Sequence, residues 1–441
     1  MRSSHSLDRL DTAFDGTQLV ADAGLLLPAT LAQHLGLKEL VEEYLDLGKA
    51  PGRANAGDKV CTLVASALAG GDCIDDAAAL HAAGTGNVLG FTVKAASTLG
   101  TFLRSFRWGH VRQLDAVSRH LLARAWAAGA GPGSAPLTID LDSTICETYG
   151  LAKDGARHHT YTHVRGYHPL LAVAAGTGDV LMARLREGRA NTVRGAAHFL
   201  TETIGRVRSA GATGELTVRA DSGFYAHAVV ATCRKMKVRF SITIRMSPAL
   251  HGRIAAIPEE AWTPIPYWLD GGADVAETTY TPFADQQDAV PVRLIVRRVR
   301  PTPGSQLALL VLYDFHAFIT DRVGETLELE ADHRRHAEIE NAIRDLKYGM
   351  GLNHLPSGKF AANGAWLAVQ VIAHNLARWT ARIGLGAGIV TTKTLRRRVF
   401  GLVGRLTRSA RRLTLHFPAH WPWAAELMIA LARLRAIPLL A

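Results

Sequence analysis

The sequence predicts a mixed α/β protein, in which a helical N-terminal region precedes an α/β domain that carries a β-rich insertion. Three observations support this prediction. Apolar residues have helical spacing through much of residues 1–130. Residues 137–246 change to short strand-like runs separated by helical stretches, in the order β-β-β-α-β-α-β. From residue 247 to about 324 the helical pattern disappears, and VPVRLIVRRVR and LALLVLYDF indicate strands.

Composition and charge narrow the class of protein. The chain has 441 residues, so we expect two to four domains. A hydrophobic fraction of 48% with 20% charged residues is typical of a globular protein. The net charge of +11 favours a polyanionic partner, of which nucleic acid is the commonest.

The cysteines and the N-terminus indicate a cellular compartment. The four cysteines are scattered without a C-x-x-C pair, which favours free thiols in a reducing compartment over a zinc site or a disulfide framework. Residues 1–20 lack the apolar segment of a signal peptide, and no apolar stretch is long enough to span a membrane. We therefore expect a cytoplasmic protein.

The N-terminal region reads as a helical bundle. Helical spacing covers Leu26 to Leu47, Lys59 to Ala69 and the later part of Ser97 to Trp126. The last of these helices carries several arginines, an arrangement that suits contact with DNA. A solvated basic surface explains the same arginines equally well.

The α/β domain begins after the linker Gly129 to Pro136, where alternation replaces helical spacing. In the run LTIDLDSTI, Asp140 and Asp142 fall on the polar face of a predicted strand. A later predicted strand, Glu215 to Ala220, ends at Asp221. If the two strands are neighbours, Asp142 and Asp221 lie within reach of one ion. Taken singly, each aspartate also fits an ordinary turn or helix cap.

A predicted helix from Ala331 to Gly351 supplies a third acid. On a helical wheel, one stripe carries Glu340 and cationic or imidazole groups, namely His333, His336, Arg344 and Lys347. A second stripe is apolar, with Ile339, Ile343, Leu346 and Met350. A salt-bridged surface helix would show this pattern too. With Asp142 and Asp221, however, Glu340 would complete an all-oxygen site for two Mg²⁺ or Mn²⁺ ions, with Asp140 as the main rival ligand.

The order of several motifs resembles a known group of proteins. The motifs are DLDST (140–144), GYHPLL (166–171), RADSGFY (219–225), IENAIRDLK (339–347) and LPSGKFAAN (355–363). Together they resemble bacterial insertion-sequence transposases of the Asp-Asp-Glu type, most closely the insertion-sequence thirteen-eighty group. The resemblance implies a ribonuclease H-like core with a β insertion before the last acid, and it assigns the metals to Asp142, Asp221 and Glu340.

One departure from the family pattern affects the phosphate contacts. The last motif of the family is Tyr, two residues, Arg, three residues, Glu, six residues, Lys. Here the spacing from Glu340 to Lys347 fits, but His333 stands at the Tyr position and His336 at the Arg position. Because imidazole is only partly charged near neutral pH, Arg344 is a candidate to take over phosphate binding. We expect Lys347, Arg344, His336 and His333 to face DNA phosphate.

The resulting division of the chain has five parts. These are a helical DNA-binding domain (1–130), the first part of the catalytic core (131–246), the β-rich insertion (247–325), the second part of the core (326–385) and a basic C-terminal DNA-contacting or dimer region (386–441). The arginines expected to contact DNA in the last region are Arg396, Arg397, Arg398, Arg405, Arg408, Arg411 and Arg412.

The resemblance implies a DNA transposase. It would bind the terminal inverted repeats of its own element, pair two ends as a homodimer, cleave the strands and join them to target DNA. Two alternatives remain open: a structure-selective nuclease on the same fold, and a catalytically silent DNA-binding protein derived from a transposase. Metal-dependent nicking and a strand-transfer product would discriminate among these three readings.

Overall fold

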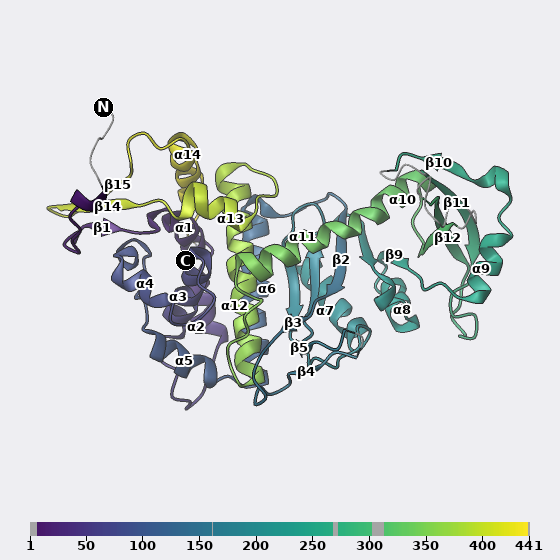
Figure 1. The fold of residues 1–441 in the computed structure, drawn as a ribbon, viewed down its shortest axis with the longest axis horizontal. Helices are drawn as coiled ribbons and strands as arrows, with labels where there is room; N and C mark the ends of the chain where they lie inside the picture. The colour runs from purple at the N-terminus through teal and green to yellow at the C-terminus, as the bar shows by residue number, and fades with distance from the viewer. Residues whose placement is uncertain (1–6, 161, 268–271, 302–312, 440–441) are drawn as a thin grey trace.

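A mixed β-sheet extends from the middle of the molecule to one end (Figure 1). The computed structural model describes residues 7–160, 162–267, 272–301 and 313–439. Within them the sheet has nine strands in the order β10-β11-β12-β13-β9-β8-β2-β6-β7. The strands are β2 (Leu137–Ser143), β6 (Leu170–Ala174), β7 (Val180–Arg184), β8 (Leu216–Ala220), β9 (Arg239–Thr243), β10 (Thr263–Ile265), β11 (Ala273–Tyr280), β12 (Val292–Val299) and β13 (Asp314–Thr320).

Five of these strands have the ribonuclease H-like arrangement that the family resemblance implies. In the order β7-β6-β2-β8-β9, the strands β2, β8 and β9 are parallel, whereas β6 and β7 are antiparallel to their neighbours. The apolar face of β2 supplies Leu137, Ile139 and Leu141 to the core, as the alternation in LTIDLDSTI predicts. The predicted fold class is therefore confirmed.

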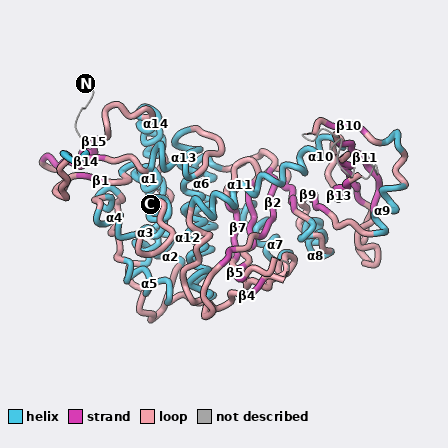
Figure 2. The backbone as a smooth tube through the Cα atoms, viewed as in Figure 1, coloured by secondary structure: helices cyan, strands magenta, loops and turns pink. Residues whose placement is uncertain are grey.

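The insertion continues this sheet instead of forming a separate one. Strand β13 pairs antiparallel with β9, and β12, β11 and β10 follow outward to the end of the molecule (Figures 1 and 2). Much of the predicted run LALLVLYDF lies outside the described residues, and β13 begins at Asp314.

The insertion also contains a helix that the sequence reading missed, α9 (Pro248–Ala255). Ser247 caps it by accepting the backbone N–H of Leu250 at 3.2 Å, and Pro248 occupies its first turn. Ser followed by Pro is a helix-start signal. The expectation that helix disappears after residue 246 was therefore wrong at this point.

Helices flank the sheet and build the N-terminal part. They are α1 (Leu26–His34), α2 (Leu37–Tyr44), α3 (Ala56–Ala69), α4 (Ala77–Ala82), α5 (Ala96–Arg104), α6 (Trp108–Ala125), α7 (Ala196–Ser209) and α8 (His227–Lys235). A long helix, α12 (Phe360–Trp379), packs against α3, α6 and β7 and is buried along most of its length, including Trp366 and Trp379. It joins the helical part to the sheet, as Figure 1 shows.

The C-terminal region packs on the N-terminal helices. It contains α13 (Thr392–Leu395), β14 (Gly404–Ser409), β15 (Arg412–His416) and α14 (Ala424–Arg435). Strand β14 pairs with β1 (Leu19–Val20), and α14 packs against α1. Residues 386–439 therefore share one structural unit with the N-terminal helices, at the end of the molecule opposite the insertion (Figure 1). Among the described residues, no helix is both long and apolar enough to cross a membrane.

Candidate active site

Two neighbouring parallel strands carry the first two acids to one edge of the sheet. Asp142 is the penultimate residue of β2, and Asp221 directly follows β8. In the register of these strands Leu141 lies opposite Ala220, so the two aspartates occupy successive positions at the carboxyl ends. Parallel strands end at the same edge, and this geometry brings together residues that are 79 positions apart in the chain, as predicted.

The third acid lies on a helix that follows the insertion. The helical segment begins with α10 (Thr326–Arg334), earlier than predicted, and passes through a 3-10 turn (Arg335–Glu338) into α11 (Ile339–Arg344). The predicted apolar stripe is buried, because Ile339, Ile343, Leu346 and Met350 all lie in the core. Burial of this stripe leaves Glu340 exposed on the other side of α11.

The charges of Asp221 and Glu340 affect the pKa of Asp142. The pKa of Asp142 is raised to about 6, chiefly by burial, and the charges of Asp221 and Glu340 contribute to this rise. The charge of His336 and a hydrogen bond from the backbone N–H of Ser143, 2.6 Å from Asp142 Oδ1, act in the opposite direction. A divalent cation would relieve the electrostatic repulsion on this partly buried carboxylate.

The acids do not form a compact three-ligand cluster. Among the described residues, the one group of three His, Cys, Asp or Glu residues whose ligand atoms all lie within 4.8 Å of one another is Asp72, Cys73 and Asp76. In that group, Asp76 Oδ2 accepts the backbone N–H groups of Asp72 and Cys73, as a turn residue does. Asp142, Asp221 and Glu340 therefore border a common region without meeting at one point.

Asp140, the rival ligand in the sequence analysis, is bound by cationic side chains. Arg219 donates from Nε to Oδ1 at 2.6 Å and from Nη2 to Oδ2 at 2.8 Å. Oδ1 also lies 2.9 Å from Nδ1 of His336. Asp140 and Arg219 are each only 1% exposed. A carboxylate so enclosed is already neutralised by the protein, and we do not retain Asp140 as a metal ligand.

Arg219 is a functional-site residue that the sequence reasoning missed. Besides Asp140, its guanidinium binds the backbone carbonyl oxygen of Asp332 on α10, and Asp332 in turn pairs with Arg322. Arg219 therefore links β2 and β8 to the helical segment that carries Glu340. The available signal was a charged residue within LTVRA, a strand that is otherwise buried and mostly apolar.

His333 and His336, which stand at the Tyr and Arg positions of the family motif, both contact other side chains of the protein. His333 lies with Nδ1 2.8 Å from Ser241 Oγ and Nε2 2.9 Å from Thr243 Oγ1, and its ring stacks on Phe318. Burial lowers its pKa well below the usual range. Both ring nitrogens are occupied, so the structure contradicts the expected phosphate contact for His333. The Nδ1 atom of His336 lies 2.9 Å from Oδ1 of Asp140, and its expected contact with phosphate stays a prediction.

Lys347 and Arg344 differ in how they are held. Lys347 Nζ donates to the carbonyl oxygen of Ile145 at 2.7 Å, in the segment that follows β2. It therefore lies close to the strand end that presents Asp142. Arg344 is exposed on the last turn of α11, where its guanidinium reaches Asn341 Oδ1 at 3.5 Å.

The arginines of the C-terminal region fall into two groups. Arg396 caps α3, since it donates to the carbonyl oxygens of Ala67 and Leu68 and to that of Gly349. Its expected contact with DNA is therefore contradicted. The other six are exposed, four of them on or between the strands of the β14–β15 hairpin: Arg397, Arg398, Arg405, Arg408, Arg411 and Arg412.

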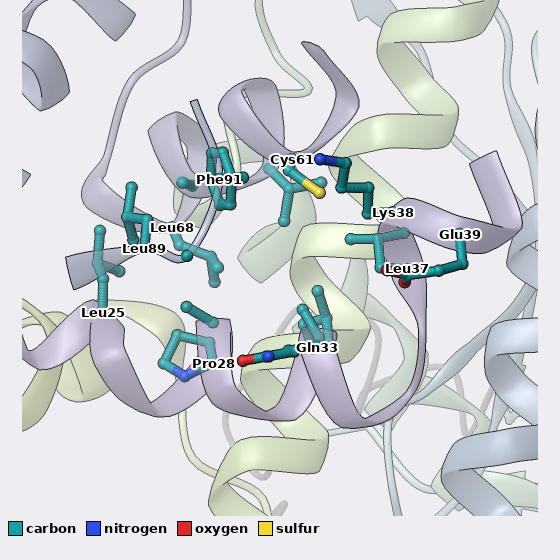
Figure 3. Close-up of a pocket in the computed structure, with 16 residues that line it drawn as sticks. Leu25, Pro28, Gln33, Leu37, Lys38, Glu39, Cys61, Leu68, Leu89 and Phe91 are labelled. Atoms are coloured by element: carbon teal, nitrogen blue, oxygen red, sulfur yellow. The ribbon is translucent and has the colours of Figure 1, made fainter. Parts of the chain in front are cut away.

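An apolar cavity elsewhere in the protein takes no part in this site. Figure 3 shows side chains such as Leu25, Leu68 and Phe91 around it, with Lys38 and Glu39 at one end. The cavity measures about 180 Å³ and lies between α1, α3 and residues 89–91 of the N-terminal unit. It holds none of the three acids, so it is not the reaction centre.

Comparison with known proteins places the chain in a family. A search of curated proteins finds no match. Among solved structures, the cryo-EM structure of a piggyBac transposase synaptic complex with hairpin DNA is similar at 12% sequence identity and a TM-score of 0.45, covering 86% of this chain and 80% of that one. The family model described as transposase DDE domain group 1 matches residues 3–439. This protein therefore belongs to the transposase DDE domain group 1 family.

Proposed function

We propose that the protein is a DNA transposase that binds the terminal inverted repeats of its own insertion sequence and performs metal-dependent strand cleavage and strand transfer. The observation that carries the proposal is that Asp142 and Asp221 stand at the carboxyl ends of neighbouring parallel strands, where the charges of Asp221 and Glu340 both raise the pKa of Asp142. Membership of a transposase family supports the same reaction class.

Asp142, Asp221 and Glu340 would hold the metal, most simply two Mg²⁺ ions, with Mn²⁺ as an alternative. Their donor set fits such ions, because it consists of carboxylate oxygens and because Asp142 is partly buried and feels two like charges. When bound, the ions would activate the attacking water or 3′-hydroxyl and stabilise the leaving oxygen at phosphorus. The contacts of Arg219 with Asp140 and with the carbonyl oxygen of Asp332 would hold β2, β8 and the Glu340-bearing helical segment in fixed relative positions.

Cationic groups around the acids and at the far end of the molecule would bind the DNA. Lys347 and Arg344 lie on the same helical segment as Glu340 and would contact phosphates near the cleaved bond. The exposed arginines of the β14–β15 hairpin would contact a more distant part of the duplex. We infer a homodimer in the DNA complex, because two element ends must be held together.

The proposal is tested by replacing each acid with its neutral isostere. Asp142→Asn, Asp221→Asn and Glu340→Gln should each abolish Mg²⁺-dependent cleavage of a duplex that carries the element end. Binding of that duplex without metal should remain close to that of the unmodified protein. Glu338→Gln is a matched control, because Glu338 lies two residues away, is exposed and pairs with Arg335. Full cleavage by all three variants would refute the assignment.

Two rival functions are separated by the products. A structure-selective nuclease would cut the duplex but give no strand-transfer product with target DNA. A silent DNA-binding protein would bind the element end without nicking it. A silent protein is suggested by the histidines at the Tyr and Arg positions of the motif. His336, at the Arg position, nevertheless contacts Asp140, with Nδ1 2.9 Å from Oδ1.

A further inference from the structure

The helical segment that carries Glu340 contains a second carboxylate, Asp345, which points into the protein. Asp345 begins a single π-helical turn (Asp345–Gly349) that continues α11 without a break. Such turns are rare in proteins and occur frequently at functional sites. Glu340 is exposed, whereas Asp345 is only 8% exposed. One short stretch of helix therefore presents one acid to the proposed metal site and buries another.

Asp345 accepts two hydrogen bonds from one residue of the C-terminal region. Thr392 begins α13, and its backbone N–H donates to Oδ1 of Asp345 at 2.9 Å, while its hydroxyl donates to Oδ2 at 2.9 Å. Thr392 is 1% exposed. Two groups of α12 lie near the same carboxylate, since Nη2 of Arg378 is 3.5 Å and Nδ1 of His374 is 3.6 Å from Oδ2. A buried carboxylate with these partners is held strongly in place.

Gly349, at the end of the turn, makes room for this contact. A Cβ atom at residue 349 would lie 2.8 Å from Oδ1 of Asp345 and 3.2 Å from Cβ of Thr392, closer than side-chain atoms normally pack. The carbonyl oxygen of Gly349 accepts a hydrogen bond from Arg396, which also donates to the carbonyl oxygen of Leu68 on α3. Both ends of the turn are therefore bound to the unit formed by the N-terminal helices and the C-terminal region.

The middle of the turn is bound to the strand end that presents Asp142. Lys347 Nζ donates to the carbonyl oxygen of Ile145 at 2.7 Å, and Ile145 follows Asp142 by three residues. Residues 345–349 thus connect the proposed reaction centre to α13 and α3.

Glu340 lies between two anchors of its helical segment. Upstream, Arg219 binds the carbonyl oxygen of Asp332 on α10. Downstream, Asp345 binds Thr392, about 7.5 Å from Glu340 along the helix axis. Because Glu340 is exposed, its position relative to the two aspartates follows that of the helix backbone. Mg²⁺ requires nearly ideal octahedral geometry, so a small shift of this backbone would weaken its binding.

We propose that Asp345 is a positioning residue for Glu340: by binding Thr392 it fixes the Glu340-bearing helix to α13 and so sets the place of Glu340 at the metal ions. This inference rests on the proposed function, because it needs metal held by Glu340. It assigns a task to a residue of the IENAIRDLK motif that the proposed reaction leaves unused, and it makes α13 part of the support of the reaction centre.

Thr392→Val tests the proposal, because it removes the hydroxyl and keeps the branched shape of the side chain. Binding of Mn²⁺ to the full-length protein without DNA, followed by electron paramagnetic resonance of the free ion, should weaken about tenfold, as is usual when the support of a metal ligand is lost. Asp345→Asn, which leaves one acceptor oxygen for two donors, should have a similar effect. Thr392→Ser, which restores the hydroxyl, should bind Mn²⁺ as the unmodified protein does.

Cleavage of an end-bearing duplex provides a second readout of the same variants. Thr392→Val should need about tenfold more Mg²⁺ to reach half of its maximal rate, in line with the weaker metal binding. Its binding of the duplex without metal should not change, because the substitution leaves the exposed arginines in place.

Two comparisons separate positioning from a general loss of stability. Thr203→Val is the matched control, because it removes another buried hydroxyl, which donates to the carbonyl oxygen of Phe199 within α7, and it should leave Mn²⁺ affinity unchanged. Glu340→Gln should weaken Mn²⁺ binding by itself, and adding Thr392→Val to it should cause no further loss. Additive losses in the double variant, or an unchanged Mn²⁺ affinity in Thr392→Val, would overturn the positioning role.

The proposed function and the positioning role can fail separately. If the unmodified protein binds Mn²⁺ with the expected dependence on Glu340 and Thr392 but does not cleave the duplex, the transposase function is refuted and the role of Asp345 stands. If Glu340→Gln leaves Mn²⁺ affinity unchanged, Glu340 is not a metal ligand, and the role of Asp345 is overturned with it.

Discussion

Two carboxylates on one strand have opposite surroundings. Asp140 and Asp142 are two residues apart on the same face of β2. Asp140 is enclosed by the guanidinium of Arg219 and the ring of His336. Asp142 faces the charges of Asp221 and Glu340, and burial is the main reason why its pKa rises to about 6. The fold thus neutralises one carboxylate with its own cations and leaves the other in need of a cation from outside.

This difference assigns different tasks to neighbouring residues. A buried carboxylate with a two-point guanidinium contact contributes to the position of the strands and of α10. A partly buried carboxylate among like charges lowers the stability of the folded protein, and a bound divalent ion would offset this loss. If this contrast is correct, changes at the two positions should alter stability in opposite directions.

The largest effect on stability is expected at the buried ion pair of Arg219 with Asp140. Arg219→Met removes the guanidinium from Asp140 and should lower the free energy of unfolding by about 3–5 kcal/mol, because the buried carboxylate then keeps only the His336 ring as a partner. Urea denaturation measures this loss. Arg335→Met is the control, since its exposed pair with Glu338 should be worth at most about 1 kcal/mol.

A double variant sharpens this prediction. Arg219→Met combined with Asp140→Leu should recover much of the lost stability, because no buried charge is then left without a partner. If Arg219→Met alone were as stable as the unmodified protein, Asp140 would not depend on Arg219, and the contrast between the two carboxylates would collapse.

The next effect concerns Asp142, where replacement should stabilise the protein by an amount that depends on pH. The pKa of Asp142 in the folded protein is raised from 3.8 to about 6, so its contribution is most favourable below about pH 4 and is lost as the pH rises through 6. Without metal at pH 8, Asp142→Asn should therefore stabilise the protein by up to about 3 kcal/mol. Near pH 4 the advantage should largely disappear.

Thermal unfolding with and without Mg²⁺ completes that test. Mg²⁺ should raise the melting temperature of the unmodified protein at pH 8 but should have little effect on Asp142→Asn. A variant that is less stable than the unmodified protein at pH 8 without metal would show that Asp142 is not under electrostatic strain.

The same contrast applies to the arginines of the C-terminal region. Arg396 is committed to carbonyl oxygens at the end of α3, whereas Arg408 and Arg411 are exposed on the β14–β15 hairpin. Arg408→Ala combined with Arg411→Ala should lower the slope of log binding constant against log salt concentration by about 2 and leave stability unchanged. Arg396→Ala should leave this slope unchanged and lower the free energy of unfolding. Fluorescence anisotropy across a salt series and urea denaturation distinguish the two, and an unchanged slope would remove the hairpin from the DNA interface.

The sequence was sufficient to predict the core strands and the helix that carry the three acids. Alternation in β2 and the strand ending at Asp221 depend on local pattern, and the apolar stripe of Ile339, Ile343 and Leu346 depends on helical period. These local patterns place Asp142, Asp221 and Glu340 on elements that the fold then brings to one edge. Their roles as metal ligands stay a prediction.

The sequence was not sufficient to distinguish Asp140 from Asp142. Both lie on the same face of β2, and the difference arises because Arg219 on the adjacent strand lies opposite Asp140 in the register. The partners of His333, Ser241 and Thr243, are similarly contributed by β9, about 90 residues earlier in the chain. Arg396 caps a helix more than 300 residues away. Such long-range pairings leave no periodic signal in the sequence.

The smallest effect is expected where the family motif is altered. His336→Arg should leave cleavage unchanged or increase it, because a guanidinium at this position would keep a cationic contact with Asp140 and would stay charged at every working pH. Its permanent charge would also oppose the repulsion at Asp142, whose pKa the charge of His336 lowers. The measurement is the cleavage rate of the variant beside that of the unmodified protein on the same end-bearing duplex. A complete loss of cleavage would instead give the imidazole a role of its own, and the cationic surroundings of Asp140 would then serve the reaction as well as the fold.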